Sequence, residues 1–235
     1  MTPLVLWDVD GTLVDAGGLG TRMYEDVFRA MFGRELTTVA PKAGRTDRAI
    51  IADTLALANV PEAPAWVDAF LAALNAHVMT LGGVADSVVL ALPGAAAALA
   101  ALRGRAFQSV LTGNVRPLAE LKLRAAGLCA GEMGAPLNFD AGAYGDAHEV
   151  RAELVAVARR AAKAVYGVNF DGHATVLVGD TPLDMAAALA TGARAIGVAT
   201  GSYSPADLAD TGAHAVLSDL RDTARLLAAL TDSTP

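Results

Sequence analysis

The stretch that decides the fold runs Leu4-Val5-Leu6-Trp7-Asp8-Val9-Asp10-Gly11-Thr12-Leu13, close to the start of the chain. Its first four residues are apolar, and a short apolar run that ends at a turn signal is typical of a buried strand. The run delivers two carboxylates, Asp8 and Asp10, to the end of that strand, where the ligands of an open parallel sheet bind. Successive strand side chains alternate between faces, so the two carboxylates share one face if the strand stays regular through both.

Two carboxylates this close raise each other's pKa unless a cation lies between them. Asp8 and Asp10 therefore predict a metal-assisted site. One alternative remains open at this point, because Asp-Gly between apolar runs is also a hairpin signal. In that case residues 5–9 and 13–14 would form two antiparallel strands.

The composition limits which kinds of fold and partner this chain can have. The chain has 235 residues, of which 54% are hydrophobic and 18% charged, so it is long and apolar enough to bury one large core or two small ones. Its net charge is −7 and it has no run of Lys or Arg. This argues against nucleic acid or an anionic membrane as the main partner. A small anionic substrate stays possible, since a metal and a few donors can invert the local field.

Cysteine usage and hydropathy indicate the compartment. Cys129 is the only cysteine, which excludes an intrachain disulfide and fits a reducing cytoplasm. The first residues lack the basic region of a signal peptide. The most apolar stretch, residues 88–102, is interrupted by Pro93-Gly94 and is too short to span a bilayer. We expect a cytoplasmic protein without a membrane partner, and the sequence leaves its oligomeric state open.

Hydrophobic spacing divides the chain into two parts. Residues 20–32, 47–59 and 65–81 have helical spacing, and Gly82-Gly83 is expected to close this set. From Pro93 onward, helices alternate with short apolar strands, which predicts an α/β fold with a doubly wound parallel sheet. The expected strands are 108–111, 174–178, 195–198 and 215–217, and the expected helices are 94–102, 117–126, 149–166, 183–191, 205–210 and 221–230. We expect a core domain of residues 1–14 and 84–235, with residues 15–83 inserted as a helical domain.

A polar turn follows the expected strand 108–111. Thr112, Gly113 and Asn114 present a hydroxyl and loosely held backbone N–H groups, which are donors for an anion such as phosphate. The alternative is an ordinary turn without a ligand.

Two more carboxylates follow the expected strand 174–178. Asp180 comes directly after Gly179, Pro182 stands where a helix begins, and Asp184 lies one helical turn beyond Asp180. Together with Asp8 and Asp10 they form a set of hard oxygen ligands that favours Mg²⁺. The alternative is that Asp180 only caps the helix.

A phosphoryl group also needs a cation. Arg151 follows the glycine-containing loop 141–148 and begins a helix, which places it at the ligand edge of the sheet, and its fork suits phosphate oxygens. Lys122 is the second candidate, but it lies about 15 Å along its helix from the strand end. In the helical insert, the polar loop holding Arg45 and Thr46 is the best candidate for reaching substrate. Alternatively, Thr46 only caps the next helix.

Taken together, Asp8-Val9-Asp10-Gly11-Thr12, Thr112 and Gly179-Asp180-Thr181-Pro182-Leu183-Asp184 resemble the signatures of the haloacid dehalogenase-like (HAD) hydrolase superfamily. The helical insert resembles the cap of its phosphoglycolate-phosphatase-like branch. The resemblance implies a HAD-like Rossmannoid core and a phosphoaspartyl mechanism.

The resemblance also implies roles for the acidic residues. Asp8 would be the nucleophile, Asp10 the acid/base, and Thr112 would hold the phosphate. Mg²⁺ would bind to Asp8, to the main-chain carbonyl of Asp10 and to Asp180, supported by Asp184. Many members carry Lys-Pro at the position of the cation. This chain has no Lys-Pro, and Gly145-Asp146-Ala147-His148-Glu149-Val150-Arg151 resembles members with Arg there.

The sequence thus predicts a Mg²⁺-dependent phosphatase that hydrolyses a small phosphorylated metabolite. The second Asp of the first motif favours phosphate chemistry over dehalogenation, because the dehalogenases proper lack it. Two alternatives are a phosphotransferase or mutase (phosphoglucomutase-like) of the same superfamily and a non-catalytic, receiver-like phosphorylation switch. A receiver is usually about half this length and carries its phosphorylated Asp on an internal strand.

Overall fold

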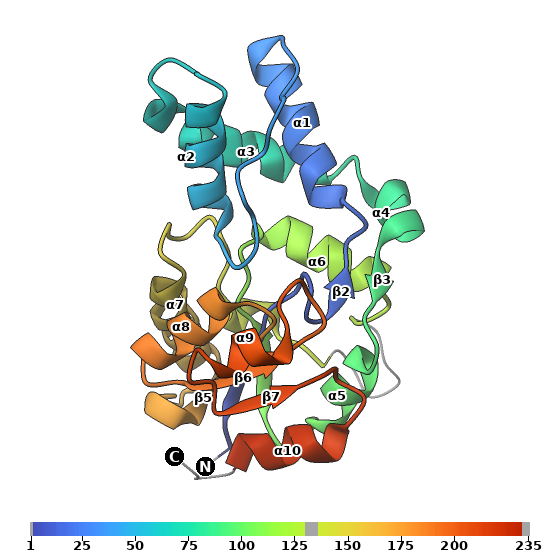
Figure 1. The fold of residues 1–235 in the computed structure, drawn as a ribbon, viewed down its shortest axis with the longest axis vertical. Helices are drawn as coiled ribbons and strands as arrows, with labels where there is room; N and C mark the ends of the chain where they lie inside the picture. Colours follow the sequence, from blue (N-terminus) through green and yellow to red (C-terminus); the bar gives the residue numbers. More distant parts are fainter. Residues whose placement is uncertain (1, 130–135, 232–235) are drawn as a thin grey trace.

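A computed structural model describes residues 2–129 and 136–231. Residues 1, 130–135 and 232–235, which the expected core domain includes, lie outside the described residues. Within the described part, five parallel strands form one sheet in the order β4-β1-β5-β6-β7 (Figure 1). The strands are β1 (Leu4–Trp7), β4 (Phe107–Val110), β5 (Thr175–Gly179), β6 (Arg194–Val198) and β7 (Ala215–Leu217). This topology confirms the doubly wound parallel sheet.

The first strand occupies an interior position. In β1, Leu6 pairs with Ser109 of β4 on one side and with Leu177 of β5 on the other, both in parallel register. A strand hydrogen-bonded to parallel neighbours on both sides is not an arm of a hairpin. The hairpin alternative for residues 5–14 is therefore wrong.

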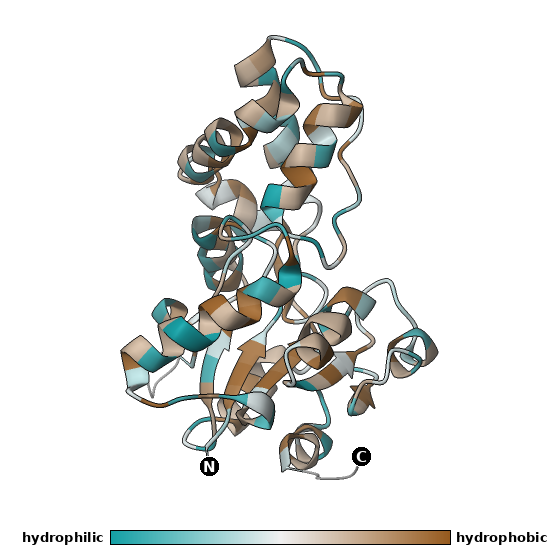
Figure 2. Ribbon diagram, turned by 90° about the vertical axis from the view of Figure 1, so that its left-hand side faces the viewer, coloured by the Kyte–Doolittle hydropathy of each residue, from teal (hydrophilic) through white to brown (hydrophobic). Residues whose placement is uncertain are grey.

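The sheet is buried on both faces, which explains why its strands read as continuous apolar runs. Leu4 and Leu6 pack into one core, while Val5 and Trp7 pack into the other. The first core is covered by α7 (Arg151–Tyr166), α8 (Pro182–Ala190) and α9 (Pro205–Ala209), and the second by α5 (Ala95–Ala101), α6 (Arg116–Ala125) and α10 (Thr223–Thr231). Figure 2 shows the mostly hydrophobic strands lying between these helices.

Four further helices stand beyond the carboxyl edge of the sheet (Figure 1). They are α1 (Leu19–Phe32), α2 (Asp47–Leu57), α3 (Val67–Val78) and α4 (Gly82–Val88), with a short 3-10 turn at Ala63–Trp66. The chain enters this group through β2 (Val14–Asp15) and leaves it through β3 (Leu90–Ala91), and these two short strands pair antiparallel. Gly82-Gly83 begins α4 instead of closing the helical set. The expected helix 65–81 is shorter in the structure, because α3 ends at Val78.

Within the described residues, no single helix is long and apolar enough to cross a membrane. The pair Ala63–Val78 and Gly82–Val88 passes a test of length and composition only when taken together, and it bends by 79° at its break.

Candidate active site

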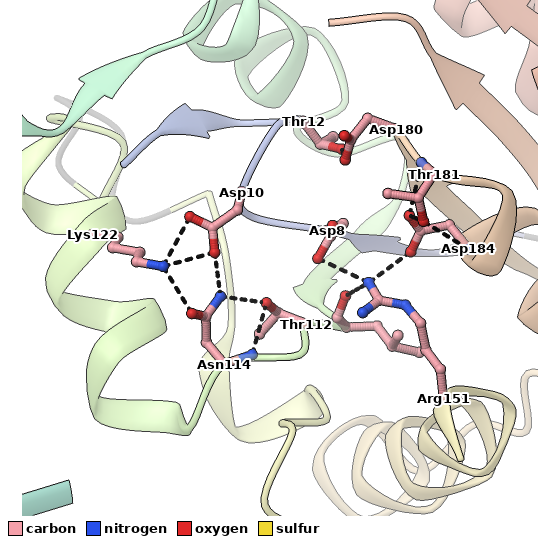
Figure 3. A network of polar contacts seen from close by, with 11 residues as sticks. Asp8, Asp10, Thr12, Thr112, Asn114, Lys122, Arg151, Asp180, Thr181 and Asp184 are labelled. Atoms are coloured by element: carbon pink, nitrogen blue, oxygen red, sulfur yellow. Dashed lines mark hydrogen bonds and ion pairs between the residues drawn. The ribbon is translucent and has the colours of Figure 1, made fainter. Parts of the chain in front are cut away.

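The carboxyl ends of β1, β4 and β5 open into a cavity of about 440 Å³ beneath the four inserted helices. Figure 3 shows how the polar side chains of this site lie around the end of β1. The sequence-predicted residues that line the cavity are Asp8, Asp10, Arg45, Thr112, Gly113, Asn114, Arg151 and Asp180, together with the second-choice cation Lys122. Tertiary folding therefore brings most of the predicted residues to one place.

Asp8 lies at the end of β1 and is buried. Its N–H donates to the Val178 carbonyl at 2.9 Å, which extends the β1–β5 pairing by one residue and fixes its backbone. Arg151, the first residue of α7, places its Nη2 at 2.9 Å from Asp8 Oδ1 and at 2.6 Å from Asp184 Oδ1. Arg151 thus reaches the site as predicted, and in this structure its guanidinium bridges two carboxylates.

Asp10 meets a different cation. Lys122 Nζ donates to both carboxylate oxygens of Asp10, at 2.8 and 2.7 Å, and to Asn114 Oδ1 at 2.8 Å. Asn114 Nδ2 in turn donates to Asp10 Oδ2 at 2.7 Å. The Lys122 side chain is only 3% exposed while that of Asp10 is 41% exposed, so a buried ammonium holds a carboxylate that stays open to the cavity.

Lys122 is not remote from the site, contrary to the expectation from its distance along the helix. Helix α6 lies across the upper edge of the sheet (Figure 1). Leu118, Ala119 and Leu123 pack into the core beneath α6. Packing of that face brings Lys122 over Asp10.

The side chains of Asp8 and Asp10 point in different directions, because the regular strand ends at Trp7. The backbone turns at Gly11, whose φ of 78° lies in the left-handed region that glycine favours. Asp8 faces α7 and α8, while Asp10 faces α6, on the other side of the sheet (Figure 3). The two carboxylates are therefore in separate electrostatic environments.

Three carboxylates converge on the other side of the site. Asp8, Asp180 and Asp184 each bring one oxygen to within 4.8 Å of the others. The carboxylate of Asp180 is held between two glycines, since a Cβ on Gly11 or Gly201 would lie 2.4 or 1.8 Å from Asp180 Oδ2. The side chain of Asp10 is not a member of this cluster; its expected contribution to the metal was its main-chain carbonyl.

The electrostatics of this cluster favour a bound cation. Burial raises the pKa of Asp8 to about 7, with Arg151 opposing the rise and Asp184 and Asp10 adding to it. Burial and the neighbouring Asp8 and Asp184 raise the pKa of Asp180 to about 8. One guanidinium does not balance three carboxylates, and hard oxygen ligands in this number suit a divalent cation such as Mg²⁺. The residues present therefore fit a metal site.

Asp180 is free for this role because its neighbour caps the helix. The N-cap of α8 is Thr181, whose hydroxyl donates to Asp184 Oδ2 at 2.7 Å and accepts from the Asp184 N–H at 3.2 Å. The alternative in which Asp180 caps the helix is wrong. The same capping box fixes the orientation of the buried Asp184 carboxylate beside Arg151.

The turn after β4 is braced from the inserted helices. The Thr112 hydroxyl accepts from Asn114 Nδ2 at 2.8 Å. Asp47, the first residue of α2, donates its N–H to the Gly113 carbonyl at 2.7 Å, and its Oδ2 accepts from the Val115 N–H at 2.7 Å. That Asp47 braces this turn has no local signal in the sequence, because its partners Gly113 and Val115 lie far away in the chain.

The two candidate residues of the insert differ. Arg45 lines the cavity, but its guanidinium forms an ion pair with Asp53 at 2.6 Å. Thr46 is buried and is absent from the cavity lining; its hydroxyl accepts from the Ala49 N–H and donates to the Glu149 carbonyl at 3.0 Å. The Thr46 hydroxyl therefore caps α2, as the alternative interpretation expects, and its contact with substrate stays a prediction.

The family model of the haloacid dehalogenase-like hydrolases matches residues 5–189. This segment contains every carboxylate described above. The chain belongs to this family. No curated protein matches the chain.

Three solved structures share the fold of this chain. A hydrolase from Pseudomonas syringae has 20% identity and a TM-score of 0.64, over 99% of this chain and 100% of its own. CbbY from Rhodobacter sphaeroides, in complex with phosphate, has 21% identity and a TM-score of 0.64, over 94% and 96%. A HAD family hydrolase from Deinococcus radiodurans, with bound phosphate and sodium, has 25% identity and a TM-score of 0.51, over 97% and 95%.

Proposed function

We propose that this HAD hydrolase is a Mg²⁺-dependent phosphatase that hydrolyses monoesters of small phosphorylated metabolites through an aspartyl-phosphate on Asp8. The observation that carries the proposal is the separate pairing of two neighbouring carboxylates in one cavity, Asp8 with Arg151 and Asp10 with Lys122. A nucleophile and an acid/base need different environments, and this arrangement supplies them.

In this proposal Asp8 attacks phosphorus from the metal side of the cavity. Mg²⁺ held by Asp8, Asp180 and the Asp10 carbonyl, with Asp184 behind, would reduce the repulsion between the attacking carboxylate and the phosphate. Arg151 orients Asp8 and offers further N–H donors to phosphate oxygens. The Thr112 hydroxyl and the backbone N–H groups of Gly113 and Asn114 would donate hydrogen bonds to the remaining phosphate oxygens.

Asp10 moves the protons. Burial raises its pKa, but Lys122 and Asn114 outweigh burial and hold the pKa below its ordinary value. A phosphate dianion that arrives beside Asp10 raises that pKa again, so Asp10 takes up a proton as substrate binds. It then protonates the leaving alcohol and later accepts a proton from the water that hydrolyses the aspartyl-phosphate.

The inserted helices act, in this proposal, as a cap of residues 15–83 over a core of residues 1–14 and 84–235. Two contacts support it: Asp47 binds the turn at Gly113, and the Arg48 N–H donates to the Gly145 carbonyl at 2.9 Å. A cap in this place excludes water from the phosphoryl transfer. We also propose that the protein works in the cytoplasm, which suits its single cysteine.

The first test is hydrolysis of an aryl phosphate with and without a chelator, in the wild type and in Asp8→Asn. We expect both chelation and the substitution to reduce phosphate release to background. Asp86→Asn, at an exposed position of α4, serves as the control and keeps the wild-type rate. Activity that survives in Asp8→Asn, or that needs no divalent metal, contradicts the mechanism.

The same assay separates the alternatives by product. A mutase returns the phosphoryl group to substrate and releases little inorganic phosphate. A receiver-like switch accumulates an acid-labile phosphoenzyme without turnover. The acid/base cluster of Asp10 and Lys122 beside a cavity of about 440 Å³ favours turnover over a switch.

A further inference from the structure

The cavity holds an ammonium group that the mechanism does not use. The chain has only three lysines, and two of them, Lys42 and Lys122, line the active-site cavity of a protein whose net charge is −7. Lys122 is paired with Asp10. Lys42 donates to the Thr21 hydroxyl, and it forms no ion pair with a carboxylate of the described residues.

The two ammonium groups face the same small space. Each Nζ lies 4.0 Å from the position that a Cβ would take on Gly20, so no more than about 8 Å separates them. No other atom outside the local chain comes within 4 Å of that position, and the missing side chain of Gly20 leaves it open. Burial and then Lys122 lower the pKa of Lys42. Asp10 balances the charge of Lys122, whereas Lys42 faces the same space without a carboxylate partner among the described residues, so the space favours an anion beside Lys42.

The helix that carries Gly20 adds to this field. Gly18, the N-cap of the 14-residue helix α1, and Gly20 in its first turn line the cavity. That turn contains no acidic side chain and has no side-chain cap. Its N-terminal dipole therefore reinforces the two lysines with partial positive charge.

The position of this space relative to Asp10 identifies what would fill it. Lys122 touches both oxygens of Asp10, so an alcohol that Asp10 protonates must lie beside Lys122. In the proposed mechanism the phosphoryl group lies on the opposite side, toward Asp8 and Arg151. The space between Lys42 and Lys122 would then receive the carbon part of the leaving group.

We propose that the substrate is a phosphate monoester whose leaving alcohol carries a second anionic group, a carboxylate or a second phosphate, bound between Lys42 and Lys122. Lys42 is the residue that selects for it. This inference rests on the proposed phosphatase function, because the roles of Asp8 and Asp10 in that function decide which end of the substrate lies beside Lys122. It adds a substrate class that Asp8, Asp10 and the metal ligands do not define.

Calorimetric titration with phosphonates tests the inference without any turnover. Three probes of matched length are used with the full chain and MgCl₂: 3-phosphonopropionate, propylphosphonate and propane-1,3-bisphosphonate. We expect the first or the third to bind at least about tenfold more tightly than the uncharged-tail propylphosphonate, the gain of one charge-assisted hydrogen bond. Which of the two binds more tightly distinguishes a carboxylate from a second phosphate.

Substitutions at Lys42, with Lys163 as the control position, show which residue causes the preference. Lys42→Met should remove the preference for the charged tail, and Lys42→Arg should restore most of it. Lys163→Met makes the same chemical change on an exposed face of α7 and should leave the preference intact. The inference is overturned if the wild type binds charged and uncharged tails equally, or if Lys42→Met weakens all three probes alike. Failure of the phosphatase assay with the preference intact would instead reject only the proposed reaction.

Discussion

At the scale of single residues, the structure separates two carboxylates that are neighbours in the sequence. Asp8 is held by Arg151 from α7, and Asp10 is held by Lys122 from α6. Burial and neighbouring carboxylates raise the pKa of Asp8, whereas the pKa of Asp10 is lowered. The cation each one meets decides the difference, since Lys122 and Asn114 donate three hydrogen bonds to Asp10.

The first prediction concerns Lys122. Lys122→Met should reduce kcat for alkyl phosphates by about 10²-fold, because Asp10 loses the cation that orients its carboxylate. Aryl phosphates should lose much less, since a phenolate leaves without full protonation. Steady-state kinetics with one alkyl and one aryl ester measure the difference, and Lys122→Arg should recover part of it. Equal losses with both esters would show that Lys122 acts through stability or phosphate binding instead.

At the scale of elements, the N-terminus of α2 and the turn after β4 form one unit. Asp47 accepts hydrogen bonds from the Tyr24 hydroxyl and the Val115 N–H, both at 2.7 Å. Burial raises its pKa to about 6, with Tyr24 and Val115 opposing the rise. A buried carboxylate that joins α1, α2 and the phosphate-side turn ties the position of that turn to the inserted helices.

The second prediction follows from this link. Asp47→Ala leaves the Val115 N–H and the Tyr24 hydroxyl without their acceptor, at a cost of about 1–3 kcal/mol in the free energy of unfolding. The turn at Gly113 also loses its brace, so the inhibition constant of inorganic phosphate should rise about tenfold. Asp86→Ala removes an exposed carboxylate from α4 and should change neither quantity. A loss of stability with unchanged phosphate inhibition would limit Asp47 to a structural role.

At the scale of the whole molecule, the metal ligands join the first motif to the last. Asp8 follows β1, whereas Asp180 and Asp184 come from the β5–α8 connection. Both Asp8 and Asp180 have raised pKa values, about 7 and 8. Without metal, the folded protein holds these protons more tightly than the unfolded chain, so their contribution to stability falls as pH rises toward 8.

The third prediction is a pH-dependent stabilisation by Mg²⁺. Protons compete with the metal for these carboxylates, so Mg²⁺ should give little or no stabilisation at pH 6. At pH 8, Mg²⁺ at about a hundred times its Kd should raise Tm by roughly 5–10 °C. Thermal unfolding at the two pH values measures the effect, and Asp180→Asn should abolish it. A shift that is the same at both pH values would mean that the metal binds elsewhere.

Much of the fold is predictable from local pattern. Strand 215–217 coincides with β7, and the other predicted strands lie within one residue of β4, β5 and β6. The two-residue strands β2 and β3 were not predicted, because their pairing joins residues far apart in the sequence. Helix α4 was not predicted, since a Gly-Gly pair can start a helix as well as end one.

The candidate site was predictable where it depends on strand ends and not where it depends on how helices dock. Asp8, Asp180 and Thr112 follow parallel strands, and the carboxyl ends of such strands meet at one edge whatever the details of packing. Arg151 lies at the start of a helix on the same edge, for the same reason. Lys122, Lys42 and Asp47 reach the cavity from helices and loops whose orientation depends on contacts across the molecule.

The sequence by itself determines a buried first strand, a doubly wound sheet and a set of carboxylates at its edge, because apolar runs and strand ends are local features. Only the tertiary structure decides that Asp8 and Asp10 point to different cations and that Lys42 stands opposite Lys122. The reason is physical. Ion pairs between residues more than a hundred positions apart form where α6 and α7 pack on opposite faces of the sheet, and no local pattern encodes that meeting.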